Sequence, residues 1–215
     1  TTFGNGTYLG DGTIDFNGTQ TVNFDASPTT LENLVFDLVG SNITVGGTGS
    51  AVVGNTATLL LGGGSFSAPL TNNGTTRVQN GTTNFNMAPN NTADMFLEAT
   101  IIGSTTINFN NGFDNSGTLT IDNVYASASR NVTVTVTGGA LNNTGTVNVV
   151  QTGGGGTYSL TGALDNSGTV NIDKTFTLAG DGITHINQVG GNIAISSGRT
   201  LTITGAGSTF TNAGT

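Results

Sequence analysis

Cysteine is absent from this chain of 215 residues, and charged residues make up only 7% of it. The absence of cysteine excludes disulfides and thiolate metal sites. Four lysines and arginines stand against twelve aspartates and glutamates, which gives a formal net charge of −8. A chain with so few basic residues has no cluster that could neutralise phosphates. We therefore expect neither nucleic acid nor an anionic membrane surface as a partner.

Long apolar runs are missing as well. No stretch approaches the roughly 18 apolar residues that a membrane-spanning helix needs, so we expect no membrane insertion. No stretch has the charged, apolar and small-residue layout of a signal peptide either. Because the chain begins at Thr1 rather than methionine, we interpret it as processed or excerpted, and the missing signal does not argue for the cytosol.

Glycine, threonine and asparagine are abundant instead and together form nearly half of the chain. Helices disfavour this composition, whereas short strands separated by turns tolerate it. Strand signals recur as alternations of β-branched and polar residues, most cleanly over 132–137 and 200–204. Hydrophobic residues are only 34% of the chain, but its low charge does not fit disorder. These features predict an all-β protein with a thin, regular core.

One phrase repeats along the chain. Residues 141–149 read LNNTGTVNV and residues 164–172 read LDNSGTVNI, with further copies beginning at Leu70, Phe113 and Phe210. A decayed copy begins at Ile186. Neighbouring copies lie roughly 22–28 residues apart, and a fixed period of this size is typical of a solenoid. We therefore predict a right-handed parallel β-helix (β-solenoid) of about nine or ten coils, which forms one continuous domain over residues 1–215.

Within each copy, the first apolar residue and the later apolar pair should point inward. The Asn-x-Gly between them should form a sharp corner, because glycine tolerates positive φ. Corners that recur at the same place in each coil would stack their asparagines into a hydrogen-bonded ladder. The predicted ladder residues are Asn72, Asn115, Asn143, Asn166 and Asn212. The predicted inward residues are Leu70, Val78, Phe113, Leu119, Ile121, Leu141, Val147, Val149, Leu164, Val170 and Ile172.

Residues 87–98 depart from this pattern. They contain both methionines and one of the three prolines but no glycine. We expect this segment to be a loop or a short helical excursion from the stack, and insertions of that kind often carry binding.

Residues suited to catalysis are few, and we expect no enzyme. His185 is the only histidine, and we expect it at the surface or at a corner. Asp94 and Glu98 are the best carboxylate pair for glycosidic chemistry, but a spacing of four brings them together only on a helix. No basic residue lies close to Asp94 in the sequence. A polysaccharide-cleaving β-helix stays as an alternative function.

Two further alternatives concern ions and ice. Asp11 and Asp181 each lie between two glycines, in turns where oxygen ligands could converge, so they are weak calcium candidates. We expect no other cofactor. Thr133, Thr135 and Thr137 share one face of a strand, and a flat threonine array could match a water lattice. Because such threonines do not recur cleanly at one place in the phrase, ice binding is a second alternative function.

The phrases at 164–172 and at 31–38 (LENLVFDL) resemble the repeats of large bacterial surface proteins. These families include autotransporter passenger domains, filamentous-haemagglutinin-like adhesins and giant repetitive adhesins. The resemblance implies an extracellular or cell-surface structural and adhesive module without shared catalytic residues. Cell-surface or extracellular polysaccharide is the implied ligand class. The Asn-Pro-Asn-Gly secretion motif of some of these proteins is missing, so the export route stays open.

The two ends of the chain suggest self-association. Neither resembles the polar cap that a free-standing solenoid needs. Placing Gly214-Thr215 before Thr1-Thr2-Phe3 gives a string that resembles residues 74–78, with Phe3 in an apolar slot. We therefore predict head-to-tail contacts along the solenoid axis, either within one tandem-repeat polypeptide or between separate subunits. The predicted contact residues are Thr1, Thr2, Phe3, Phe210, Gly214 and Thr215.

Overall fold

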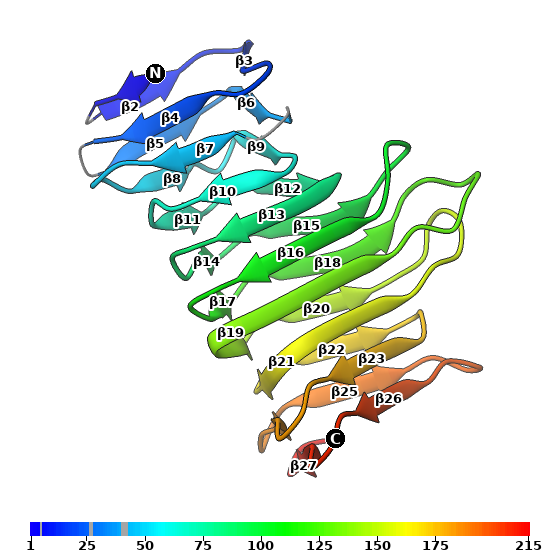
Figure 1. Cartoon of the computed structure of the whole chain (residues 1–215). Helices are drawn as coiled ribbons and strands as arrows, with labels where there is room; N and C mark the ends of the chain where they lie inside the picture. Colours follow the sequence, from blue (N-terminus) through cyan, green and yellow to red (C-terminus); the bar gives the residue numbers. More distant parts are fainter. Residues whose placement is uncertain (5, 26–27, 40–42) are drawn as a thin grey trace.

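The computed structural model describes residues 1–4, 6–25, 28–39 and 43–215. These residues form 27 β-strands and no helix (Figure 1). All pairings between the strands are parallel, and each strand pairs with strands of the preceding or following coil. The coils wind in a right-handed sense, and one sheet contains nine strands, one per coil. The predicted fold, a right-handed parallel β-solenoid, is confirmed.

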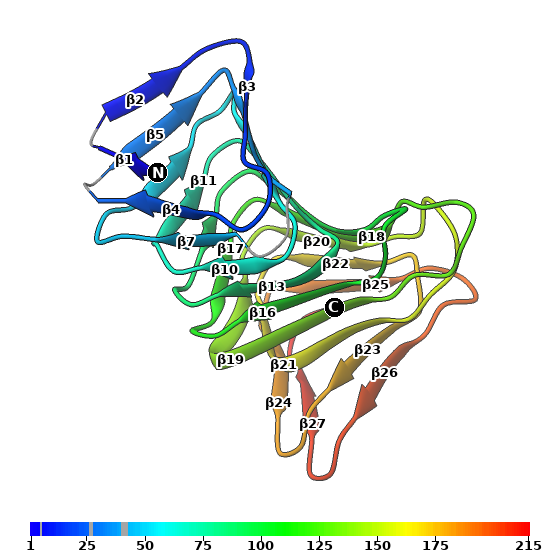
Figure 2. The ribbon, with the colours of Figure 1, turned by 45° about the horizontal axis from the view of Figure 1, so that its top comes forward.

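Each coil passes through three faces, which we call the first, second and third face (Figure 2). The first face contains β1 (Thr2–Phe3), β4 (Thr21–Phe24), β7 (Thr44–Gly46), β10 (Gly64–Phe66), β13 (Gly81–Phe85), β16 (Thr105–Phe109), β23 (Phe176–Ala179) and β26 (Leu201–Thr204). The second face contains β2 (Gly6–Leu9), β5 (Thr29–Glu32), β8 (Ala51–Val53), β11 (Leu70–Asn72), β14 (Asn90–Asn91), β17 (Phe113–Asn115), β24 (Thr184–Asn187) and β27 (Thr209–Asn212).

Two longer strands, β19 (Val132–Asn143) and β21 (Tyr158–Asn166), run round the corner from the first face to the second. The third face contains β3 (Thr13–Asp15), β6 (Val35–Leu38), β9 (Thr58–Leu61), β12 (Thr75–Gln79), β15 (Asp94–Ala99), β18 (Thr118–Asn123), β20 (Thr146–Val149), β22 (Thr169–Ile172) and β25 (Asn192–Ile195). Among the described residues the structure contains no helix that is long and apolar enough to cross a membrane.

The core lies between the three faces and is built by period-two alternation. In β19, for example, Val132, Val134 and Val136 are buried while the threonines between them point outward. All eleven residues predicted to point inward are at most 3% exposed. Phenylalanines add a continuous stack: the rings of Phe66, Phe85 and Phe109 follow one another at 5.8 and 5.1 Å.

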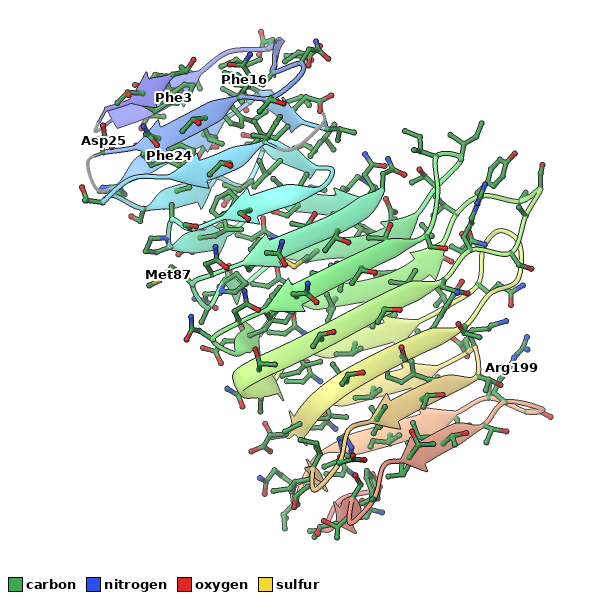
Figure 3. The ribbon with its side chains drawn as sticks, in the orientation of Figure 1. Phe3, Phe16, Phe24, Asp25, Met87 and Arg199 are labelled. Carbon is green, nitrogen blue, oxygen red and sulfur yellow. The ribbon has the colours of Figure 1, made fainter. Side chains whose placement is uncertain are left out.

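Residues 87–98 do not leave the stack, so the expectation of a loop or short helix is wrong. They contain β14 and the first five residues of β15, which pairs with β12 and β18 over its length. The physical reason is that Met95 and Leu97 are alternate residues of a strand, and both side chains are fully buried while Phe96 between them is only half-buried. Met87, before β14, is the one large hydrophobic side chain of this segment that is exposed, at 45%, and it lies at the edge of the second face (Figure 3).

The corner glycines also differ from expectation. None of Gly117, Gly145 and Gly168 has a positive φ. A Cβ atom on Gly145 or Gly168 would instead lie 2.2 Å from the carbonyl oxygen of the glycine one coil earlier. Glycine is therefore required because the stacked corners approach too closely for a side chain, and its conformational freedom is not used at these positions.

Candidate functional site

The asparagine column is the most regular polar feature of the molecule. Asn72, Asn91, Asn115, Asn143, Asn166, Asn187 and Asn212 follow one another at the end of the second face. Each Nδ2 donates to the Oδ1 of the next asparagine at 2.6–2.7 Å. From Asn72 to Asn187 the side chains are at most 1% exposed. The column therefore holds neutral, buried and mutually bonded amides.

The five asparagines predicted for this column all lie in it, and the structure adds Asn91 and Asn187. Asn91 was missed because its copy of the phrase, NNTAD, has alanine where the others have glycine. Asn187 lies in the decayed copy. The column begins at Asn72, whose Oδ1 has no hydrogen-bond partner among the described residues, because the preceding coil has Val53 at that place. The ladder thus stabilises the stack and offers no ligand site along its buried length.

The predicted carboxylate pair is not brought together. Asp94 and Glu98 both belong to β15, and four residues of strand separate their Cα atoms by roughly 13 Å. Glycosidases hold their two carboxyl groups about 5 to 9.5 Å apart. The two carboxylates were expected to lie close together because the segment was expected to be helical, and in a strand they are too far apart for glycosidic chemistry.

Glu98 has different partners, which the sequence reading missed. Arg77 Nη1 lies 2.5 Å from Glu98 Oε1, and the guanidinium stacks on the ring of Phe96 at 4.1 Å. Asp122 is the register neighbour of Glu98 on the next strand, and its carboxylate accepts bonds from the main-chain nitrogen and hydroxyl of Thr152. Aligning Leu97-Glu98 with Ile121-Asp122 in the repeat would have revealed this neighbourhood.

This acidic pair is closed to solvent. Glu98 is 5% exposed and Asp122 is 3% exposed, while the Arg77 side chain, at 38%, forms the outer cover. Two buried carboxylates on adjacent strands repel each other, and the guanidinium offsets that cost. The arrangement locks three coils of the third face together and leaves no carboxylate oxygen facing an open cleft.

His185 is placed contrary to expectation. Its side chain is fully buried on β24 and does not lie at the surface. Neither ring nitrogen has a hydrogen-bond partner among the described residues. Burial lowers the pKa of His185 below its usual value, because the charged imidazolium would lose its hydration. The alternation of the decayed phrase, with Thr184 and Ile186 outward, is the reason that this residue points inward.

The two calcium candidates lie in exposed turns. Asp181 Oδ1 accepts a hydrogen bond from the main-chain nitrogen of Ala206 at 2.8 Å, which ties two successive coils together. Asp11 is exposed before β3. Among the described residues, no three histidine, aspartate or glutamate side chains come together as a metal-binding group. Calcium binding at either turn stays a prediction.

The outer surface of the first face is a regular array of small polar side chains. One column contains Thr82, Thr106, Thr133, Ser159, Thr177 and Thr202 in register. A second column, two residues along each strand, contains Asn84, Asn108, Thr135, Thr161, Ala179 and Thr204. The threonines therefore align better than the sequence reading expected, because coils of unequal length still keep strand register.

Charge is absent from this surface. No aspartate, glutamate, lysine or arginine lies in any strand segment of the first face. All four basic residues lie instead on the third face or in the loops that lead from it to the first face: Arg77, Arg130, Lys174 and Arg199. Figure 3 shows Arg199 at that edge. The solenoid thus presents one uncharged face and one charged edge.

A hollow of about 710 Å³ lies at the same edge, near the N-terminal coils. Asn17, Val39, Gly63, Asn80 and Ile102 are among its lining residues, and none of the described lining residues is charged. It offers amides, main-chain groups and apolar contact, but no acid or base.

The two ends of the solenoid leave core residues partly uncovered. Tyr8, Ile14 and Phe16 at the N-terminal end are only partly buried, as are Ile193, Leu201, Ile203 and Phe210 at the C-terminal end. The outermost strands, β1, β2 and β3 at one end and β25, β26 and β27 at the other, each pair with a single neighbour. The two ends lie at opposite extremes of the stack (Figure 1).

The register suggested by joining the ends is wrong. The resemblance to residues 74–78 would place Thr2–Phe3 on the third face, where β12 lies. The strand β1 instead pairs with β4 on the first face, with Phe3 opposite Phe24. The physical reason is aromatic packing: the Phe3 ring lies 5.2 Å from Phe36 and 5.0 Å from Tyr8.

Comparisons of this sequence and fold with known protein families, curated proteins and solved structures find no match.

Proposed function

We propose that this chain is a structural and adhesive module of a bacterial surface protein, located outside the cell and without catalytic activity, which stacks end to end into a fibre. The repeat phrase and its resemblance to bacterial surface proteins support the location. The confirmed solenoid fold is compatible with a stalk or fibre. The burial of Glu98 and its ion pair with Arg77 favour a structural role for this acid, which the sequence had suggested as part of a carboxylate pair.

The observation that carries the stacking proposal is the state of the two ends. Apolar side chains that would be covered inside the stack are partly exposed there, and six strands have an unpaired outer edge. Unpaired edges of this kind are templates for pairing with another chain. A contact between opposite ends is heterologous; it need not close on itself, and when it stays open it builds a filament.

Sedimentation velocity of the purified chain over a wide concentration range tests this proposal. We expect the sedimentation coefficient to rise with concentration. Ile203→Lys, which places a charge on the C-terminal end surface, should abolish that rise. Thr177→Lys is the matched control, because Thr177 is a half-buried outward residue on the neighbouring coil of the same face. A parent protein that stays monomeric throughout, or an Ile203→Lys protein that associates like the parent, would sink the proposal.

The adhesive part of the proposal is directed at polysaccharide outside the cell. A neutral polysaccharide, with its many hydroxyl groups, is complementary to the uncharged first face and its columns of hydroxyl and amide side chains. Retention on insoluble neutral polysaccharide should fall with Thr133→Lys on the first face. It should not fall with Thr146→Lys, an equally half-buried threonine on the third face. Equal retention of the parent, Thr133→Lys and Thr146→Lys proteins would show that the first face does not bind polysaccharide.

Ice binding is a second candidate function, and the same two columns favour it. Their side chains repeat about every 4.8 Å between coils and roughly every 6.6 Å along each strand, which forms a two-dimensional array of hydroxyl groups. Thermal hysteresis measured on the parent, Thr133→Lys and Thr146→Lys proteins tests this reading. A freezing-point gap that only Thr133→Lys removes would favour ice over polysaccharide, and no gap in the parent would exclude it.

A further inference from the structure

His185 occupies a place in the core that apolar residues occupy in neighbouring coils. On the second face, the residue two positions before each ladder asparagine points inward, and in successive coils these residues are Leu70, Pro89, Phe113, Leu141, Leu164, His185 and Phe210. Leu164 and Phe210 are therefore its neighbours in the column. An imidazole in such a place has no polar group to bond with, and neither of its nitrogens has a partner among the described residues.

This histidine also lies close to an end of the molecule. Its strand β24 has β21 on one side and β27 on the other, and β27 has no further neighbour. The last coils are also less well covered, since Ile195 is 48% exposed and Leu201 and Phe210 are only partly buried. Opening them costs fewer apolar contacts than opening the middle of the stack.

We propose that His185 makes the last coil, β26 and β27, separate from β23 to β25 when the pH falls into the mildly acidic range. The neutral imidazole is tolerated in the apolar column, whereas the imidazolium must reach water. Water is reached by separating β27 and β26 from the coils before them. The open state therefore binds a proton that the closed state excludes.

Among the strands around His185, only β21 carries other titratable side chains, while in the loops of the same coils Asp181 accepts a hydrogen bond from Ala206 and Asp173 accepts one from Ser196. Of the two strands paired with β24, β27 has no titratable residue, and β21 has Asp165 and Tyr158. Asp165 points outward and accepts a hydrogen bond from Gln188 Nε2 at 2.8 Å. Burial raises the pKa of Tyr158 to about 12, so this phenol stays neutral in acid. The strands β22, β23, β25 and β26 contain no titratable side chain.

The direction of the effect follows from linkage. The pKa of His185 is lowered in the folded protein, so the opened protein binds more protons as the pH falls below the usual histidine value. Stability of the last coil is therefore fully present above about pH 6.5 and decreases below it. Between pH 7.5 and pH 5.0 the open population should rise by up to about 30-fold, if the closed form takes up no proton.

Hydrogen–deuterium exchange, corrected for intrinsic rates, tests the proposal on dilute, unassembled protein. The protection of amides in β24 and β27 should fall by up to about 30-fold on acidification, while amides in β12, β15 and β18 should change much less. His185→Leu, which matches Leu164 in the same column, should remove that difference. If this variant does not fold, His185→Phe, which matches Phe113 and Phe210, replaces it.

Thr76→Val is the matched control. The Thr76 hydroxyl is likewise fully buried without a partner among the described residues, but it does not titrate. Its removal should leave the acid response of β24 and β27 intact. Equal protection of these strands at both pH values in the parent, or an equal fall in His185→Leu, would overturn the proposal. Because the experiment uses unassembled protein, its outcome is independent of end-to-end stacking. Release of stacked subunits in acid is the consequence that rests on the proposed function.

Discussion

Single side chains in this molecule have well-defined roles because each is repeated or interrupted along a column. Asn143 lies in the middle of the ladder, where it donates to Asn166 and accepts from Asn115. Asn72 lies at its beginning, where its oxygen has no partner among the described residues. The contribution of an asparagine side chain to stability therefore depends on its place in the stack.

Replacing the two residues separately measures that difference. Asn143→Val removes the bond that Asn115 donates, and it takes the Asn143 donor away from Asn166 Oδ1 and from two main-chain carbonyl oxygens, so it should lower the free energy of unfolding by about 2 to 4 kcal/mol. Asn72→Val takes a donor away from Asn91 Oδ1 and from the Asp94 carbonyl oxygen, but it also removes one unpartnered oxygen and extends the apolar column of Val53, so its cost should be less than half as large. Equal losses in urea denaturation would contradict the role assigned to the ladder.

At the scale of elements, corners decide which strands can stack. The third face follows each corner directly, so a displaced corner shifts the strand that begins after it, as β20 begins after Gly145. The close approach of Gly145 to Gly117, one coil earlier, sets the distance between two such corners. Backbone contact at the corner thus maintains the register of the strands.

Gly145→Ala tests this contact. The added methyl group would lie 2.2 Å from the Gly117 carbonyl oxygen, so the backbone must move, and we expect a loss of about 1 to 3 kcal/mol in stability. Gly10→Ala is the control, because a Cβ there meets nothing within 4 Å and Gly10 has no positive φ. Its thermal unfolding should stay within about 0.5 kcal/mol of the parent. A harmless Gly145→Ala would show that the corners do not determine strand spacing.

Strand pattern and repeat were sufficient to predict the fold, the inward residues and five members of the asparagine column. Periodicity identifies these features because every coil must bury the same face against its neighbours. It failed at residues 87–98, where two methionines and a proline outweighed an intact alternation at Met95 and Leu97. It also failed at His185, because residue type was given more weight than position in the phrase.

Contacts between coils were the features that sequence spacing could not supply. Arg77 meets Glu98 across 21 residues because loop lengths vary between coils while strand register is kept. The alignment of the first-face threonines between coils could not be predicted from the sequence for the same reason. Register becomes visible only when the strands are paired in space.

At the scale of the whole molecule, the solenoid has two unlike ends and three unlike faces. One face lacks charge, one contains the Arg77–Glu98 pair, and both ends leave apolar residues partly exposed. We propose that association runs along the solenoid axis, because the ends combine partly exposed apolar side chains with unpaired strand edges. The proposed fibre is therefore the central functional claim.

Electron microscopy of the purified chain at high concentration tests that claim most directly. Nine to ten coils at about 4.8 Å each give an expected axial repeat of about 45 Å, in unbranched filaments no wider than one solenoid. Filaments with this repeat, absent in Ile203→Lys, are the predicted result. Isolated particles at every concentration, or assemblies in which solenoids lie side by side, would contradict it.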